Sequence, residues 1–380
     1  MREVAVIGAG STVFGKLPDK LVKDMGSEAV WAAIDDAHIN PDEIQTAWAA
    51  TSFGGNVIGE RILTTAGITG IEVINVENAC AGGATAFRGA WWAVASGLHD
   101  IALAVGVESM TTTIAGKLIA PEPDDLSGDL GNSAPAHFAL SMRRHMEKYG
   151  TTLEQFAQVS VKNHRNGCLN PYSQYQKELS IEEILKSRMI VDPITLLQCC
   201  PNSDGAAAVI LCPLEMAAKY TNKPVTVIAS VLNMGEPEYR WQDLAISDMT
   251  AKAAKQAYEI AGCRPEDIDV CELHDAFCYC EIAHYEELGF CPVGEGGRFI
   301  DEGSADIGGK IAVNPSGGLL SRGHPVAATG VEQIAEIVWQ LRGEAGKRQV
   351  PGAKLGLAHT IGGEVASLES GTVAIHILKA

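Results

Sequence analysis

The sequence has few positive charges and no long apolar run. Lys and Arg number 29 against 47 Asp and Glu, which gives a formal net charge of −18 at pH 7. Because nucleic acids are bound by clustered Lys and Arg, this balance argues against a nucleic acid as the main partner. No apolar run reaches the ~18 residues of a membrane span, and no basic and apolar leader opens the chain. We therefore expect a cytoplasmic protein with no membrane partner.

The 10 cysteines lack the arrangement of a disulfide framework. They are scattered through apolar or small-residue surroundings of a large chain, which is typical of reduced intracellular thiols. Cys278 and Cys280 lie near His274 and His284. The two-residue gap and the second cysteine pair of a zinc site are missing there, so we predict no metal. We also predict no covalently bound cofactor.

A dinucleotide motif is incomplete at the start of the chain. Residues 4–10 form an apolar run that ends in Gly8 and Gly10, but the third glycine of the motif is replaced by Val13. No acidic residue closes a second strand nearby. An ordinary buried first strand is the better interpretation.

Short apolar runs alternate with helical patterns, which predicts an α/β fold. We expect strands over residues 45–51, 71–76 and 101–106, and helices over 23–37 and 84–96. From about residue 111 to 197 the pattern loosens, with helical stretches at 136–149 and 152–163. We interpret this region as a loop-and-helix insertion that covers one face.

The second half of the sequence repeats the first. Residues 33–53 match 257–277, residues 80–85 match 324–329, and residues 101–106 match 354–359. A duplication predicts two similar layered α/β halves (αβαβα) about a pseudo-twofold axis, spanning residues 1–235 and 236–380. Cys80 and His324 would then occupy equivalent strand-to-helix elbows that face each other.

Cys80 is the strongest candidate for a catalytic residue. It follows a strand-like run and precedes a helix, where the unpaired N–H groups of the helix N-terminus favour a thiolate. Taken alone, Cys80 could equally be a small buried residue, and His324 a helix-cap or core histidine. The repeat pairs the two residues, and an imidazole beside a thiol activates it as a nucleophile.

Further candidates lie at strand ends and in the insertion. His274 and His359 each end a strand of the second half, where α/β folds place ligands. Ser316 and Gly317 open a glycine-rich stretch that lets a substrate approach the backbone. A cationic group in the insertion is either a solvated helix face or a contact for the phosphates of an anionic ligand; its candidate members are Arg143, Lys162, His164 and Arg165.

Several motifs resemble those of thiolases, of the sterol-carrier-protein and archaeal acetyl-CoA acetyltransferase type. They occur in family order over nearly the whole chain, at residues 78–83, 162–167, 200–207, 274–277 and 323–330. The resemblance implies a thiolase-like fold, a homodimer, and CoA and acyl-CoA as substrates. It implies that Cys80 attacks a 3-oxoacyl-CoA and becomes acylated, with CoA bound by the insertion.

The same resemblance assigns two oxyanion holes. His324 and His274 would hold the leaving enolate, and backbone N–H groups of Cys80 and near Gly362 would form the second hole. The sequence departs from the family at the second acid/base, because Ala276 stands where a cysteine is often found and residues 358–362 contain no cysteine. Cys278, Cys280, His359 or water are candidate substitutes.

Two other functions fit the motifs. The set of Cys80, His274 and His324 also resembles the site of decarboxylating ketoacyl synthases, which condense a malonyl-type donor. Alternatively, the chain is a thiolase-like subunit that needs a small zinc-containing OB-fold partner.

Overall fold

The computed structural model describes residues 1–119, 125–131, 133–236, 243–363, 365 and 370–380. The first part of the chain alternates strands and helices. Its elements are β1 (Val4–Ser11), α1 (Val22–Ala37), η1 (Pro41–Glu43), β2 (Thr46–Ala50), α2 (Ile58–Ala66), β3 (Glu72–Val76), η2 (Ala79–Ala81), α3 (Gly82–Ala95) and β4 (Ala102–Ser109).

Helices and loops dominate the region that follows, as expected for an insertion. Its elements are α4 (Met110–Thr113), α5 (Leu126–Asp129), α6 (Ala134–Tyr149), α7 (Leu153–Gly167), α8 (Ile181–Leu185), β5 (Met189–Val191), β6 (Ile194–Thr195) and η3 (Leu196–Gln198). The chain then returns to the sheet through β7 (Asp204–Pro213).

The rest of the chain repeats the alternation. Its elements are α9 (Leu214–Ala217), β8 (Val225–Asn233), α10 (Asp248–Ala261), η4 (Pro265–Asp267), β9 (Val270–Glu272), α11 (Cys278–Glu287), α12 (Gly296–Asp301), β10 (Ala312–Val313), α13 (Gly318–Ser321), α14 (Thr329–Arg342), η5 (Gly346–Arg348), β11 (Leu355–Gly362) and β12 (Thr372–Lys379). None of the helices in the described ranges combines the length and apolarity needed to cross a bilayer.

The order of the strands in the sheet shows the duplication. Ten strands form one mixed sheet in the order β10-β9-β11-β12-β8-β1-β7-β4-β2-β3. Read inward from each end, β10-β9-β11-β12-β8 has the same order and strand directions as β3-β2-β4-β7-β1. The two sets join where β1 pairs with β8, at Ala5↔Thr226 and Val6↔Val225. The boundaries predicted at residues 111, 197 and 235 stay predictions.

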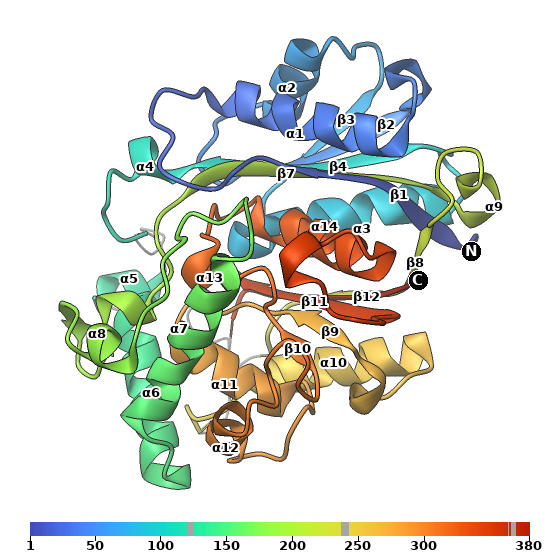
Figure 1. The fold of residues 1–380 in the computed structure, drawn as a ribbon. Helices are drawn as coiled ribbons and strands as arrows, with labels where there is room; N and C mark the ends of the chain where they lie inside the picture. The colour runs from blue at the N-terminus through green and yellow to red at the C-terminus, as the bar shows by residue number, and fades with distance from the viewer. Residues whose placement is uncertain (120–124, 132, 237–242, 364, 366–369) are drawn as a thin grey trace.

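Five layers result, and they confirm the predicted α/β fold of two duplicated halves (Figure 1). Helices α1 and α2 cover the outer face of one set of strands, and α10 and α11 cover the outer face of the other. Helices α3 and α14 lie between the two sets, while α6 and α7 stand at one side of the stack. The elbows that precede α3 and α14 therefore meet in the central layer.

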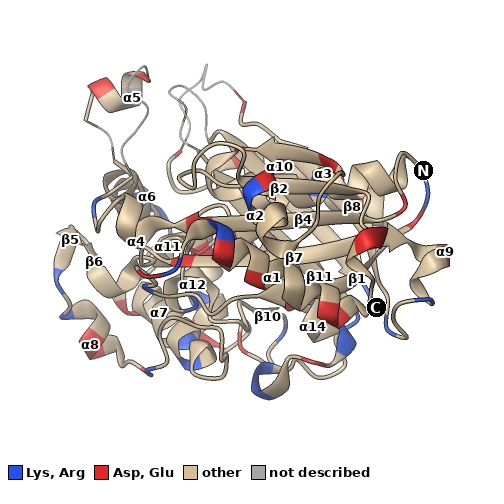
Figure 2. Ribbon diagram, turned by 90° about the horizontal axis from the view of Figure 1, so that it is seen from above, with Lys and Arg blue, Asp and Glu red and all other residues tan. Residues whose placement is uncertain are grey.

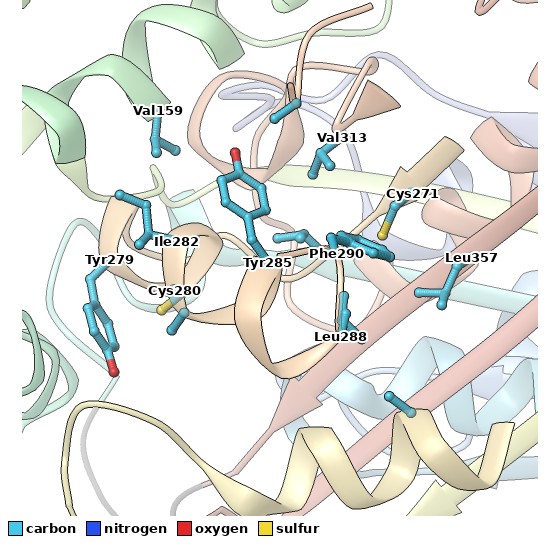
Figure 3. Packing of buried hydrophobic residues seen from close by; sticks show 14 of the residues in the cluster. Val159, Cys271, Tyr279, Cys280, Ile282, Tyr285, Leu288, Phe290, Val313 and Leu357 are labelled. Carbon is cyan, nitrogen blue, oxygen red and sulfur yellow. The ribbon is translucent and has the colours of Figure 1, made fainter. Parts of the chain in front are cut away.

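The sheet is buried on both faces because its strands alternate between two cores. In β1, Val4 and Val6 pack in the central core, whereas Ala5 and Ile7 pack under the outer helix α1. A third core lies around α11, where Tyr285 and Phe290 pack near Cys271 and Leu357 (Figure 3). Continuous apolar strands of this kind are typical of sheets covered on both sides.

Two glycines bring the central helices into close contact. A Cβ at Gly83 of α3 would lie 2.4 Å from the Ala327 carbonyl oxygen, and one at Gly330 of α14 would lie 2.4 Å from the Ala84 nitrogen. Gly8 of β1 is similar, because its Cβ would lie 2.2 Å from the Ala33 carbonyl oxygen in α1. The glycines of the first strand thus serve helix packing.

Candidate active site

Cys80 lies on a sharp turn between β3 and α3. It sits in η2, one residue after Ala79, whose φ of 47° is in the left-handed region that non-glycine residues rarely adopt. The Asn78 side-chain amide donates to the Thr85 hydroxyl at 2.9 Å, and that hydroxyl donates to the Ala81 carbonyl at 2.9 Å. These bonds hold the turn in a fixed shape at the start of the helix.

His324 meets Cys80 from the second elbow. Its Nε2 lies 3.3 Å from the Cys80 Sγ, and its Nδ1 lies 2.8 Å from the Thr329 hydroxyl oxygen. That hydroxyl donates its one proton to the Pro325 carbonyl at 3.0 Å. It must therefore accept from His324, which puts the proton of the neutral ring on Nδ1 and turns the Nε2 lone pair toward Sγ.

His274 completes a group of three side chains. It follows β9, and its ring meets the ring of His324 edge-on with centroids 5.2 Å apart. The potential ligand atoms of Cys80, His274 and His324 all lie within 4.8 Å of one another. One thiol and two imidazoles thus converge on one small space.

Both histidines are buried, and burial decides their charge. Burial lowers the pKa of His324 to about 3, and the nearby Arg322 cation adds to this effect. Burial, followed by the neighbouring His324, holds the pKa of His274 well below its usual value. Because burial disfavours the charged form of each ring, both rings are neutral at physiological pH.

The end of β11 closes the site. A Cβ at Gly362 would lie 2.4 Å from the Ala81 nitrogen and 2.9 Å from the Cys80 nitrogen. Only glycine allows this approach, so the backbone of Gly362 and the backbone of Cys80 line the same corner.

Comparison with known proteins agrees with this geometry. The family model described as "Thiolase, N-terminal domain" matches residues 4–215, and the one described as "Thiolase C-terminal domain-like" matches residues 237–376. The chain belongs to the thiolase family. Its members are acyltransferases, and CoA and acyl-CoA are substrates of this thiolase.

Individual relatives cover nearly the whole chain. It is 45% identical over 387 residues to an acetyl-CoA acetyltransferase of Methanothermobacter thermautotrophicus, with 100% of each chain covered. It is 43% identical over 383 residues to sterol carrier protein 2 of Oryctolagus cuniculus, covering 94% of this chain and 70% of the relative. A solved structure named "Ltp2-ChsH2(DUF35) aldolase" has a TM-score of 0.85 and 26% identity, covering 100% and 98%. The predicted resemblance is thereby confirmed.

Two acid/base candidates of this thiolase pack in an outer layer. His359 is buried against α10 and α11, with its Nε2 3.4 Å from the Thr250 hydroxyl and its ring 4.5 Å from that of His284. Cys278 is buried in the core around α11, and burial raises its pKa well above the usual value. His359 also acts electrostatically on His274 of the site, and Cys278 has Cys199 and Gln198 among its neighbours. The acid/base role of either residue stays a prediction.

The cationic candidates of the insertion do not form one surface. Lys162 is fully buried, and its ammonium lies 2.9 Å from the Glu281 carboxylate and donates to the Val313 carbonyl. We therefore correct the expectation for Lys162, because its charge is neutralised inside the protein. His164 is also buried, with its ring stacked on Tyr175 and a pKa lowered to about 4 by burial.

The two arginines of that group are at the surface, each in an ion pair. Arg143 pairs with Asp192, and Arg165 pairs with Asp306 at 2.6 Å. Figure 2 shows basic and acidic segments interspersed over the molecule. Exposed ion pairs of this kind are weak, so both arginines remain available to an anionic ligand.

Ser316 and Gly317 are interior residues. The Ser316 hydroxyl donates to Glu272 at 2.6 Å, and a Cβ at Gly317 would lie 2.8 Å from the Cα of Gly167. Neither is exposed. The structure thus places them beneath α13 and α7, not on an open face.

Sequence reasoning missed two residues that position His324. The Ser203 hydroxyl accepts the His324 backbone N–H at 3.0 Å, and Thr329 binds Nδ1. Ser203 belongs to the motif at residues 200–207, and Thr329 is the last residue of the repeated elbow. Both residues therefore lie in stretches that the sequence analysis singled out, but it gave neither of them a role. The predicted absence of a metal stays a prediction, because Cys80, His274 and His324 could also share one cation.

Proposed function

We propose that this thiolase cleaves a 3-oxoacyl-CoA, or forms one in the reverse direction, through an acyl group carried on Cys80. The observation that carries the proposal is the 3.3 Å contact between Cys80 Sγ and the unprotonated Nε2 of His324. A base within hydrogen-bond reach of a thiol turns it into an effective nucleophile. Because each group comes from its own elbow, the contact depends on both halves of the fold.

In the proposed first step, Cys80 Sγ attacks the keto carbon while its proton passes to His324 Nε2. The imidazolium formed next to the substrate, together with an N–H of His274, would stabilise the thioester oxygen that becomes negative as the enolate forms. Donors in a buried site are more effective than in water, because little solvent screens them. The carbon–carbon bond then breaks: the acyl group stays on Cys80, and the fragment that keeps the thioester to CoA leaves as an acyl-CoA enolate.

In the proposed second step, CoA takes the acyl group from Cys80. Backbone N–H groups of Cys80 and Gly362 would hold the thioester oxygen, which is supported by the closeness of their backbones. His324 would return its proton to the Cys80 sulfur as that sulfur leaves. Arg143 and Arg165 are proposed contacts for the CoA phosphates, since a bound phosphate could displace their exposed carboxylate partners.

Product analysis by mass spectrometry tests this proposal. The protein would be incubated with CoA and a panel of linear and aromatic 3-oxoacyl-CoA esters. We expect shortened acyl-CoA products, loss of those products in Cys80→Ala, and their retention in the matched control Cys168→Ala at the end of α7. Product formation by Cys80→Ala, or none by the native chain across the panel, would contradict it.

A decarboxylating condensing enzyme is the second candidate. The observation in its favour is the convergence of one cysteine and two histidines within 4.8 Å. Release of carbon dioxide from malonyl-CoA, dependent on His274, would favour it over the thiolase reaction.

We propose a cytoplasmic homodimer that also binds a small zinc-containing OB-fold subunit. The name of the solved relative includes a DUF35 partner, which supports a second subunit. Support for the dimer is the position of β3 at the end of the sheet beside β2, where a second copy could pair with its edge. The 10 cysteines, all of them in the described part of the chain, are not joined by disulfides, which fits a reducing compartment. Light scattering of the purified chain would show twice 40.2 kDa for the dimer.

A further inference from the structure

One short segment joins the two histidine-bearing parts of the site. Cys199 forms a β-bridge with Phe277, three residues after His274, and Asn202 forms a β-bridge with His324 itself. Between them, the Cys200 backbone N–H donates to the Ala276 carbonyl at 2.9 Å. Cys200 is therefore fixed between the two histidines by backbone contacts on both sides.

The neighbouring cysteines of this segment have different surroundings. The Cys199 thiol donates to the Thr195 carbonyl at 3.5 Å, on the side of η3. The groups that act electrostatically on the Cys200 thiol are, in decreasing order, Cys199, Cys80, Asp275 and Cys280. Burial first, and then these neighbours, raise the pKa of Cys200 well above its usual value, so it keeps its proton at physiological pH.

The proposed reaction needs a proton that the histidines do not supply. When the carbon–carbon bond breaks, the α-carbon of the leaving enolate must gain a proton. The Nδ1 proton of His324 is directed to Thr329, and the proton that Nε2 takes from Cys80 in the first step returns to the Cys80 sulfur in the second. His274 is neutral, and the N–H of a neutral imidazole is a very weak acid.

The nearby carboxyl group of Asp275 is also committed. It accepts backbone N–H bonds from Leu319 at 2.7 Å and Leu320 at 3.3 Å, and a side-chain N–H from Asn163 at 2.7 Å. It therefore serves to hold α13 and α7 against the site. The protonated thiol of Cys200, on the segment that bridges to Phe277 and to His324, is better suited to give a proton to carbon.

We propose that Cys200 is the acid and base that exchanges a proton with the α-carbon of the acyl-CoA held beside Cys80. This inference rests on the proposed thiolase function. In the cleavage direction the S–H bond of Cys200 breaks, the enolate electron pair forms the new C–H bond, and Cys200 becomes a thiolate. A thiol is a far stronger acid than a carbon next to a thioester, so this transfer is downhill.

The proton returns in the second step. The incoming CoA thiol gives its proton to the Cys200 thiolate while the CoA sulfur attacks the acyl group on Cys80. The carbon–sulfur bond to Cys80 then breaks, and its sulfur takes back the proton held by His324. In the condensation direction the Cys200 thiolate removes the α-proton. Both cysteines and His324 end each cycle in their starting states.

Hydrogen exchange isolates this step. The full-length protein would be incubated with acetyl-CoA in D2O, and deuterium in the acetyl group would be followed by mass spectrometry. General acid–base groups contribute roughly 10²- to 10⁴-fold, so we expect exchange to fall by about that factor in Cys200→Ala. Cys200→Ser should fall as well, because a hydroxyl of similar size is a much weaker acid. Cys199→Ala should keep the native exchange rate.

Two controls separate the possible failures. Alkylation of Cys80 by iodoacetamide should persist in Cys200→Ala and should still be blocked by acetyl-CoA, which shows that the elbow is folded and binds the substrate. Acylation of Cys80 by acetyl-CoA in the native chain tests the proposed function itself, and its absence would overturn both proposals. Native-rate exchange in Cys200→Ala or Cys200→Ser, with Cys80 acylated in the native chain, would overturn the role of Cys200 alone.

Discussion

At the scale of single residues, burial decides the chemistry of this protein. His324, His274 and Cys200 are all uncharged at physiological pH because their charged forms lose solvation inside the fold. Neutral groups are suited to a reaction in which protons move between sulfur, nitrogen and carbon without a fixed charge. In the proposed reaction, charge forms only on the substrate and on the groups that contact it.

Burial of histidine also has a cost at low pH, which is clearest at His376 on β12. Its Nδ1 lies 3.0 Å from the Ser230 hydroxyl, and burial lowers its pKa to about 3. An unfolded histidine titrates near 6.5, so between these values only the unfolded chain takes up the proton. The contribution of His376 to stability is therefore complete above pH 6.5 and decreases as pH falls toward 3.

We predict that His376→Gln reduces this acid sensitivity. Relative to the variant, the native chain should lose about 2–3 kcal/mol of unfolding free energy between pH 7 and pH 4.5. Urea unfolding at several pH values measures the difference. Other shifted groups, such as Glu272, occur in both proteins and cancel in the comparison. Parallel stability curves for the two proteins would show that His376 is not the source.

At this scale, the sequence could not predict side-chain contacts between residues that are far apart along the chain. The cationic pattern around Lys162 gives no sign that Glu281 neutralises it from another helix. The placement of Cys200 beside the site depends on β-bridges of Cys199 and Asn202 to two distant segments. By contrast, Cys80 and His324 could be paired in advance, because the repeat itself aligned their elbows.

At the scale of elements, local patterns predicted most helices and strands. The helix expected over residues 136–149 is α6 (Ala134–Tyr149), and the one expected over 152–163 is α7 (Leu153–Gly167). The strand expected over residues 101–106 is β4 (Ala102–Ser109). The observed ends of these elements differ from the predicted ends by a few residues, because capping and tertiary contacts decide where an element stops. The one large sheet was not foreseen, since it arises from pairing of β1 with β8.

The contact between α3 and α14 gives a prediction for a pair of adjacent glycines. At Gly83 a new Cβ would lie 2.4 Å from the Ala327 carbonyl oxygen, whereas at Gly82 its nearest neighbour would be the Ala50 Cβ at 3.5 Å. We expect Gly83→Ala to lower the unfolding free energy by about 1–3 kcal/mol or more, because the two helices must separate. Denaturant unfolding measures this.

Gly82→Ala is the matched control. Both glycines are in the first turn of α3, so both changes alter helix propensity by the same amount, at most about 1 kcal/mol in favour of alanine. Gly82→Ala should therefore leave stability nearly unchanged or slightly raised. Equal changes in unfolding free energy at the two positions would mean that the contact between α3 and α14 is not the cause of the destabilisation.

At the scale of the whole molecule, the two halves share one interior. The central core contains Val4 of β1, Phe87 of α3, Val331 of α14 and Leu378 of β12. Arg342 of the second half adds a polar contact to the first half. Its guanidinium donates to Asp36 at 2.7 Å and to the Val6 carbonyl at 3.3 Å. Neither half can bury its side of α3 or α14 without the other. The candidate active site depends on the same layer, because both elbows end in it.

We therefore predict that the chain unfolds in a single thermal transition although it consists of two similar halves. Separation would expose the apolar faces of α3 and α14 to water, at a cost of about 25 cal/mol for each Å² exposed. Calorimetry should give one peak, and activity should be lost within it. A fragment of residues 1–235 should fail to show a cooperative transition, because α3 would lack its partner. Two separate peaks, or a stably folded fragment, would show that each half has a sufficient core of its own.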